Sequence, residues 1–246
     1  MHAFTAVPSG QAAMLPASFI NAIQLRLRLH LSLLSGISTC VCGAPVDPYG
    51  DHLLSCSHLL CHRTPGHDLI MNIVGRMAKR AGHVVSYDCR RPRPISHTYS
   101  PNYCPDITLL HGSETGSHVL VDVTVPSVVK QSAMPAAACM ARAVSSAAEA
   151  GKRHSYGAVA PHVVLPFVVE HAGALGKDAD KFFHAIVKKV RNELNASEEA
   201  ESSWSSRGFS NFYYQRISVA NLKGLGHFFL VAEALLRSAG NVPFGS

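Results

Sequence analysis

Four residues within the segment 40–56 have the side chains and the spacing of a zinc site. They form a Cys-x-Cys pair and, after a loop of nine residues, a His-x-x-x-Cys pair: Cys40, Cys42, His52 and Cys56. Pro45, Pro48 and Gly50 in the loop favour turns that would bring the two pairs together. Three thiolates and one imidazole are a common tetrahedral ligand set for structural Zn²⁺. The spacing therefore predicts a zinc centre, and an accidental cluster of buried thiols is the alternative.

The residues around this cluster leave the ligand set open. Cys61 and His62 follow closely and could compete as ligands. Asp51 precedes His52 and is a candidate hydrogen-bond partner for its imidazole. The chain has seven cysteines, an odd number, and its N-terminus lacks the basic and apolar pattern of a signal peptide. Clustered cysteines in a reduced, intracellular compartment indicate metal binding rather than disulfides.

Two aspartates on predicted neighbouring strands could hold a second kind of metal. Asp106 begins a predicted strand, and Asp122 lies within the next, among four alternating valines. Side chains alternate along a strand, so the valines share the buried face while Asp122 and Thr124 project from the other. An unpartnered carboxylate is costly to bury, and Mg²⁺ or Mn²⁺ shared by the two aspartates would compensate. Such a site is suited to phosphodiester hydrolysis, whereas the alternative is two aspartates satisfied by backbone amides.

Hydrophobic periodicity predicts the elements that would position these residues. Helices are expected at residues 66–82, 136–150, 178–195 and 219–239, and strands at residues 83–87, 106–110, 119–125 and 162–169. From residue 66 to residue 169 the order is α-β-β-β-α-β, which predicts an α/β core. Residues 195–207 are expected to form a loop or linker. Residues 23–33 alternate Leu as a strand does, but Leu and Arg favour a helix, which we prefer.

Composition and charge narrow the functional class. The 246 residues are 47% hydrophobic and 15% charged, which excludes a wholly disordered chain or a coiled coil. No apolar stretch approaches the roughly 20 residues that span a bilayer, so no membrane partner is expected. The net charge is +6. Residues 61–95 carry seven basic and two acidic residues, whereas the more acidic segment 96–151 follows. This pattern suits a phosphate-binding rim around a carboxylate site, and a solvated surface is the alternative.

The motifs together resemble a known family. The element order, with Pro105-Asp106 on one strand and Asp122-Val123-Thr124 on the next, resembles the restriction-endonuclease-like PD-(D/E)XK fold. The run Cys-x-Cys-Gly…Asp-Pro-Tyr-Gly-Asp-His…Cys, followed by His67-Asp68, is similar to the C-terminal region of non-long-terminal-repeat retrotransposon proteins. In that family a zinc knuckle accompanies an endonuclease that nicks target DNA to prime reverse transcription. The resemblance covers roughly residues 17–195.

The resemblance implies roles for individual residues. Asp106 and Asp122 would hold the metal, and Lys152 would stand in for the motif lysine, whose position Thr124 occupies. His67 would lie at the edge of the site. Tyr156 follows Lys152 as in a Lys-and-Tyr motif of the family. The alternatives are a helix-end cation for Lys152 and a surface or cap residue for His67. Gly66 stands where the family commonly has Arg, which is a departure from the pattern.

Three arginines complete the expected site. Arg90, Arg91 and Arg93 lie in a Pro-rich segment that leads into the carboxylate hairpin, where they could contact phosphates. The expected divisions of the chain are an N-terminal helical remnant (1–36), a zinc-knuckle-like segment (37–65), the endonuclease-like core (66–195), and a linker with a C-terminal helix (196–246).

The function expected from these observations is metal-dependent nicking of DNA. The alternatives are a decayed or domesticated nucleic-acid-binding protein that does not cut, and a zinc-stabilised protein-interaction module. DNA is the expected partner, with RNA of the parent element as a further candidate, and the resemblance alone implies a nuclear location. No Tyr-x-Asp-Asp polymerase signature is present, so we expect a fragment or stand-alone remnant.

Overall fold

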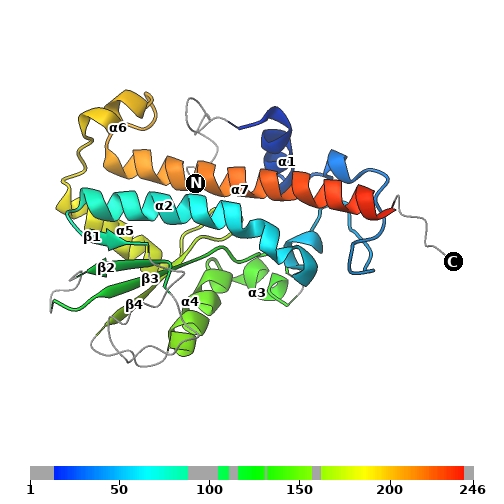
Figure 1. Ribbon diagram of the computed structural model, residues 1–246, viewed down its shortest axis with the longest axis horizontal. Helices are drawn as coiled ribbons and strands as arrows, with labels where there is room; N and C mark the ends of the chain where they lie inside the picture. The colour runs from blue at the N-terminus through cyan, green and yellow to red at the C-terminus, as the bar shows by residue number, and fades with distance from the viewer. Residues whose placement is uncertain (1–13, 88–104, 111–115, 131, 157–161, 241–246) are drawn as a thin grey trace.

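The computed structural model describes residues 14–87, 105–110, 116–130, 132–156 and 162–240, and four strands in these ranges form one mixed sheet (Figure 1). The strands lie in the order β1 (Val84–Ser86), β2 (Ile107–Leu110), β3 (Val119–Thr124) and β4 (Val163–Val168). β1, β2 and β3 are antiparallel neighbours, and β4 runs parallel to β3. The parallel pair needs a crossover connection, which the intervening helices supply. The predicted mixed α/β core is confirmed.

Helix α2 (Thr64–Arg80) packs along the sheet because its apolar residues recur at helical spacing. Pro65 lies in its first turn, and Ile70, Val74 and Met77 are buried against Val121 and other residues of the strands. The valines of β3 point into this core, while Asp122 lies on the opposite face, 6% exposed. The alternation predicted for this strand is therefore confirmed.

Helix α7 (Phe209–Gly240) runs the length of the molecule beside α2 (Figure 1). Its first half belongs to the core of the sheet, and its second half, including Phe228 and Phe229, packs around the cysteine cluster. A Cβ on Gly66 of α2 would lie 2.8 Å from Cα of Gly224, so the two helices cross in backbone contact. The predicted start of this helix at residue 219 is wrong by ten residues, because its aromatic N-terminal turns are buried by tertiary contacts.

The length and apolar composition of α7 would also suit a membrane-crossing helix. However, 56% of its most apolar window is buried inside the protein, and core helices pass the same test. The described contacts of α7 are those of a core helix.

Two further predictions from the sequence need correction. The expected helix 136–150 is two helices, α3 (Met134–Cys139) and α4 (Ala143–Tyr156). Met140 between them is extended and Arg142 has a φ of 64°, a break that Ala-rich propensity does not reveal. The expected linker 195–207 contains α6 (Ala196–Glu201), which begins with a capping box between Asn195 and Glu198.

The N-terminal helix also differs from its predicted range. Helix α1 (Pro16–Arg26) ends before most of the Leu-rich segment. Arg28 has a φ of 54°, pairs with Asp51 and lies over the ring of Tyr49. Because Arg28 makes these contacts with the loop between Cys42 and His52, the chain leaves the helical path after Arg26. The remaining elements are α5 (Lys177–Lys189) and the short 3-10 helices η2 (Ser32–Leu34), η3 (Leu53–Ser55) and η4 (Ser57–Arg63).

His171, just after β4, is buried as a neutral side chain. Its Nδ1 accepts a hydrogen bond from the backbone N–H of Val128 at 3.0 Å. Burial, with smaller effects of Arg63 and Arg26, lowers the pKa of His171 to about 4. The unfolded chain binds a proton near pH 6.5 and the folded protein does not, so stability is complete above that pH and falls as the pH drops toward 4.

We therefore expect acid to destabilise the wild-type protein more than the variant His171→Asn, whose amide oxygen can still accept from Val128. The wild-type free energy of unfolding should fall by about 2 kcal/mol more between neutral pH and about pH 5. Urea titrations of both proteins at the two pH values measure this difference. Equal losses of unfolding free energy in the two proteins would contradict the assignment. Any release of metal by acid affects both proteins alike and cancels in the comparison.

Candidate functional site

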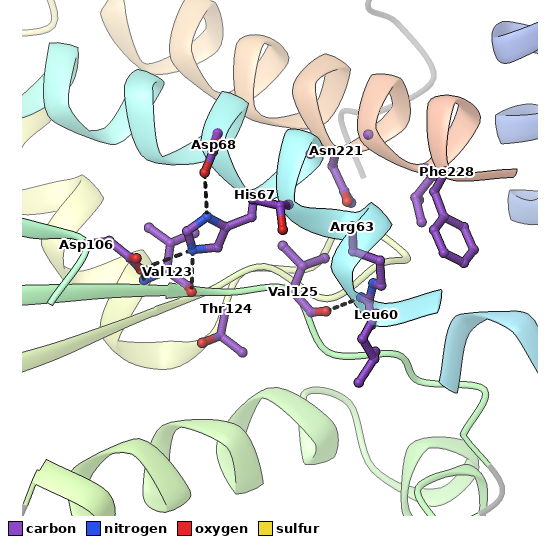
Figure 2. Close-up of a pocket in the computed structure, with 14 residues that line it drawn as sticks. Leu60, Arg63, His67, Asp68, Asp106, Val123, Thr124, Val125, Asn221 and Phe228 are labelled. Carbon is purple, nitrogen blue, oxygen red and sulfur yellow. Dashed lines mark hydrogen bonds and ion pairs between the residues drawn. The ribbon is translucent and has the colours of Figure 1, made fainter. Parts of the chain in front are cut away.

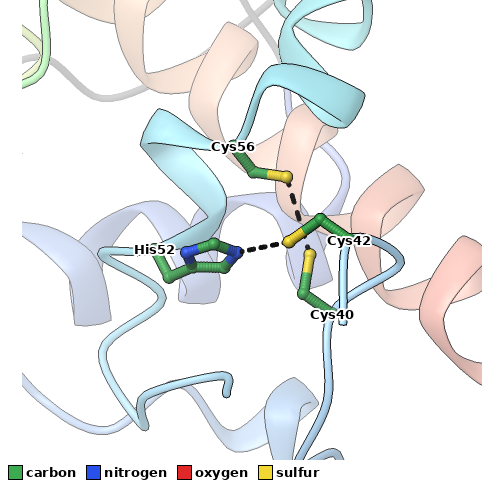
Figure 3. A group of neighbouring side chains, drawn as sticks. All are labelled: Cys40, Cys42, His52 and Cys56. Atoms are coloured by element: carbon green, nitrogen blue, oxygen red, sulfur yellow. Dashed lines mark hydrogen bonds between the residues drawn. The ribbon is translucent and has the colours of Figure 1, made fainter. Parts of the chain in front are cut away.

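The four predicted metal ligands converge, as Figure 3 shows. Their ligand atoms all lie within 4.8 Å of one another: Cys40, Cys42, His52 and Cys56. Sγ of Cys40 is 3.7 Å from Sγ of Cys56, and Sγ of Cys42 is 3.2 Å from Nε2 of His52. Two sulfurs bound tetrahedrally to zinc are about 3.8 Å apart. The donor set and its geometry could hold one metal ion and are compatible with Zn²⁺.

Asp47 holds the loop that joins the two ligand pairs. Its carboxylate accepts backbone N–H groups of Tyr49, Asp51 and His52 at distances of 2.9 to 3.1 Å. Burial alone would raise the pKa of Asp47, but these donors outweigh it and lower the pKa below its ordinary value. Sequence reasoning did not single out Asp47, although Asp before Pro-Tyr-Gly is a turn signal that could have found it.

The other residues near the cluster do not join it. Asp51, expected beside the imidazole of His52, instead pairs with Arg28 through contacts of 2.5 and 2.9 Å, so that prediction is wrong. A bidentate arginine–carboxylate pair satisfies both oxygens and leaves the imidazole to other partners. Cys61 is exposed and lies outside the group of four ligands.

Buried Cys40 and exposed Cys42 differ in pKa. Burial raises the pKa of Cys40 to about 11, whereas the backbone N–H of Ala44 lowers the pKa of Cys42 to about 7. Zinc binds thiolates, so loading this site must release protons and must strengthen as the pH rises.

Asp106 lies at the start of β2 and is held by α2 and β3 (Figure 2). Its Oδ2 accepts the backbone N–H of Val123 at 2.7 Å and lies 3.1 Å from Nε2 of His67. Nδ1 of His67 is 3.1 Å from the carboxylate of Asp68. The contact with Asp106, followed by that with Asp68, raises the pKa of His67 to about 9 despite burial. His67 therefore carries a proton at neutral pH and balances the charge of Asp106.

Asp122 contacts a different group of residues, on α4. Nζ of Lys152 lies 3.0 Å from Oδ1, and the hydroxyl of Tyr156 donates to Oδ2 at 2.7 Å. Thr124 contacts Oδ1 more weakly, at 3.4 Å. Lys152 and Tyr156 are one helical turn apart, so both reach the same carboxylate from one face of α4. The structure thus brings the Lys-and-Tyr pair that the family resemblance named into contact with Asp122.

The strand register brings the two aspartates to the same end of the hairpin. Ile107 of β2 pairs with Val121 of β3, and Asp106, just before β2, accepts the backbone N–H of Val123, the residue after Asp122. Their side-chain contacts diverge, because Asp106 is bound from α2 and Asp122 from α4. Among the described residues, the contacts of Asp106 all fall on Oδ2, which leaves Oδ1 as its oxygen for a cation. Two carboxylates with water suit Mg²⁺, although both are engaged by cations of the protein.

A cavity of about 510 Å³ adjoins Asp106 at the junction of η4, α2, β3 and α7 (Figure 2). Its polar lining includes His67, Asp106, Thr124 and Asn221, and Leu60 and Phe228 line its apolar part. Arg63 also lines it and donates to the backbone oxygens of Leu54 and Val125, which ties the cysteine segment to the end of β3. Sequence periodicity carries no signal for this role of Arg63.

The predicted phosphate-contacting residues Arg90, Arg91 and Arg93 lie outside the residues that the structure describes.

No family model matches the chain, and no curated protein sequence matches it.

Proposed function

We propose that this protein is a metal-dependent endonuclease that nicks DNA, with a restriction-endonuclease-like core derived from a non-long-terminal-repeat retrotransposon. The observation that carries the proposal is the contact of Lys152 with Asp122 on β3, next to Val123, whose backbone N–H is bound by Asp106. Two carboxylates that can hold a divalent cation, with an ammonium group nearby, are suited to phosphodiester hydrolysis. The mixed four-stranded sheet between α2 and α4 is compatible with that fold.

Each residue would have a separate task in this site. Mg²⁺ or Mn²⁺, held by Asp106 and Asp122, would polarise a phosphoryl oxygen and lower the pKa of a bound water. Lys152 would place a positive charge where the phosphate gains negative charge, while Tyr156 keeps Asp122 oriented. His67 would hold Asp106 in place from α2. Thr124 offers a hydroxyl beside Asp122 and no charge.

We further propose that the cysteine cluster holds Zn²⁺ as a structural ion and that the partner is DNA, with element RNA as a second nucleic acid. The natural place of such a protein would be the nucleus. Cys40 and Cys56 belong to the same apolar cluster as the second half of α7, which supports a structural rather than a catalytic zinc.

A second candidate function is nucleic-acid binding without cleavage. The observation that favours it is the ion pair between protonated His67 and Asp106, because a carboxylate already neutralised by the protein attracts a cation less strongly. A zinc-stabilised protein-interaction module is the third candidate.

Incubation of the protein with supercoiled plasmid in Mg²⁺ or Mn²⁺ tests the first proposal. We expect conversion to the nicked circle, and none in the presence of a chelator that removes the divalent ion. Binding of DNA without nicking in either metal would favour the second candidate. Weak binding with little dependence on salt would favour the third.

Neutralising Arg90, Arg91 and Arg93 together should weaken DNA binding for all sequences about equally. Contacts with phosphates carry position rather than sequence information, and each lost contact lowers the slope of log affinity against log salt by about one. Fluorescence titrations of two unrelated duplexes at several salt concentrations measure this slope. An unchanged slope in the triple variant would mean that these arginines do not contact phosphates and are solvated surface residues.

A further inference from the structure

A second cleft lies at the other end of α2 from His67 and is lined by residues of α2, α6 and α7. Its volume is about 400 Å³. Ile73 and Phe212 contribute apolar lining, and Ser197 of α6 contributes an exposed hydroxyl. The cleft is therefore built from three elements and lies apart from the pocket beside Asp106.

Most of the charged side chains that line this cleft are cationic. Four basic and two acidic side chains contribute: Arg76, Lys79, Arg80, Arg216, Glu198 and Glu201. Arg80 is neutralised by Glu198, whose oxygens lie 3.0 and 3.1 Å from its Nε. Arg216 is neutralised by an ion pair with Glu201. Ion pairs with the two acidic residues thus neutralise two of the four cations, and a net charge of +2 remains.

Arg76 and Lys79 supply that surplus. Both are exposed, and neither has an ion-pair partner within the described part of the chain. Nζ of Lys79 lies 5.0 Å from the ring centre of Tyr87, a contact that leaves its charge available. Burial and, after it, the charge of Arg76 lower the pKa of Arg216. This crowding of positive charge around a concave surface is what a bound anion would relieve.

We propose that this cleft binds a backbone phosphate of a DNA strand through Arg76 and Lys79. The choice of DNA rather than a free anion rests on the proposed function, whereas the presence of an anion site does not. Arg76 lies nine residues along α2 from His67, which corresponds to about 13 Å of helix. At about 3.4 Å of axial rise per nucleotide, that distance spans roughly four nucleotides of one strand. The cleft would therefore hold the strand to one side of the site at Asp106.

The test compares paired charge removals on the full chain, without divalent metal so that cleavage plays no part. Arg76→Ala with Lys79→Ala should weaken binding of a labelled DNA duplex roughly tenfold and lower the salt slope by about one, because one phosphate contact is lost. The matched control is Lys188→Ala with Lys189→Ala, which removes two exposed cations of α5 that do not line the cleft. The control should change the slope little.

A second variant leaves every cation in place. Ser197→Glu adds a carboxylate at the rim of the cleft, in the first turn of α6, where an acidic residue suits the helix. It should also weaken DNA binding, because the carboxylate repels phosphate.

The proposal is overturned if both cleft variants change DNA binding no more than the α5 control. It is also overturned if the loss occurs only with an RNA duplex of the same sequence, or only with inorganic phosphate measured by calorimetry. Loss of DNA affinity without loss of nicking at saturating protein would support the cleft as a binding site separate from the proposed catalytic residues.

Discussion

Replacing Asp122 by Asn is expected to abolish DNA nicking while the protein still folds and binds DNA. Asn keeps the shape of the side chain and can still accept the hydroxyl of Tyr156, but it removes the charge that a divalent cation needs. Asp106→Asn should have the same effect. DNA binding should survive or strengthen in both variants, because repulsion between carboxylate and phosphate is relieved. Plasmid nicking and duplex titration measure the two properties side by side.

Lys152 provides the sharper test of mechanism. Lys152→Ala should leave metal binding intact and slow nicking by about 10²–10³-fold, the usual scale for loss of one preorganised electrostatic donor. The matched control is Arg153→Ala, which removes the next cation of α4, one that pairs with Asp178 instead. Thr124→Ala should also cost much less than the lysine substitution.

Two results would contradict this assignment. Equal rates for the Lys152 and Arg153 variants would make the lysine a partner of Asp122 for folding alone. Loss of Lys152 leaves a buried carboxylate without its cation, so thermal unfolding of each variant must accompany the rates. If the wild-type protein binds DNA but never nicks it, the result would favour the second candidate function, nucleic-acid binding without cleavage.

Cys56→Ser is expected to release the zinc ion and to loosen one end of the molecule. The thiolate is one of four ligands, and Cys56 is buried among Leu53, Leu59 and Phe229. Binding of structural zinc is coupled to folding of its site, at about 10–16 kcal/mol in zinc-finger peptides. Hydrogen exchange should therefore accelerate in residues 31–63 and in the second half of α7. The sheet, whose core is a separate cluster, should keep its protection.

Cys61→Ser supplies the control for this experiment. Cys61 is five residues away, exposed and outside the ligand group, so its replacement should retain one zinc ion per chain. Elemental analysis of the native protein and both variants gives the metal content. The absence of zinc from the native protein, or full occupancy in the Cys56 variant, would contradict the assignment.

Local patterns in the sequence were sufficient to predict the main elements of the core. The valines of β3 alternate with Leu120, Asp122 and Thr124, and this period of two assigns each side chain to a face without any knowledge of its neighbours. The apolar spacing of α2 works in the same way over a period of 3.6 residues. The cysteine spacing also predicted convergence, because turn-forming residues limit where so short a loop can lead.

Contacts between distant residues decided the rest. Arg28 and Asp51 are 23 residues apart, and their pairing both ends the Leu-rich helix early and removes the expected partner of His52. The start of α7 depends on aromatic residues that are buried only when the sheet is present. Propensity along the chain does not contain these interactions, because each is formed only after the chain has folded.

The candidate nuclease site shows the same division. The sequence by itself determined that Asp122 lies on a face away from the valines, but its predicted helix ended at residue 150, before Lys152 and Tyr156. Only the tertiary structure extended α4 to Tyr156, placed Lys152 against Asp122 across 30 residues of chain, and gave Asp106 to His67 instead. Periodicity determines the direction of a side chain within its own element, whereas the packing of whole elements determines which charges meet.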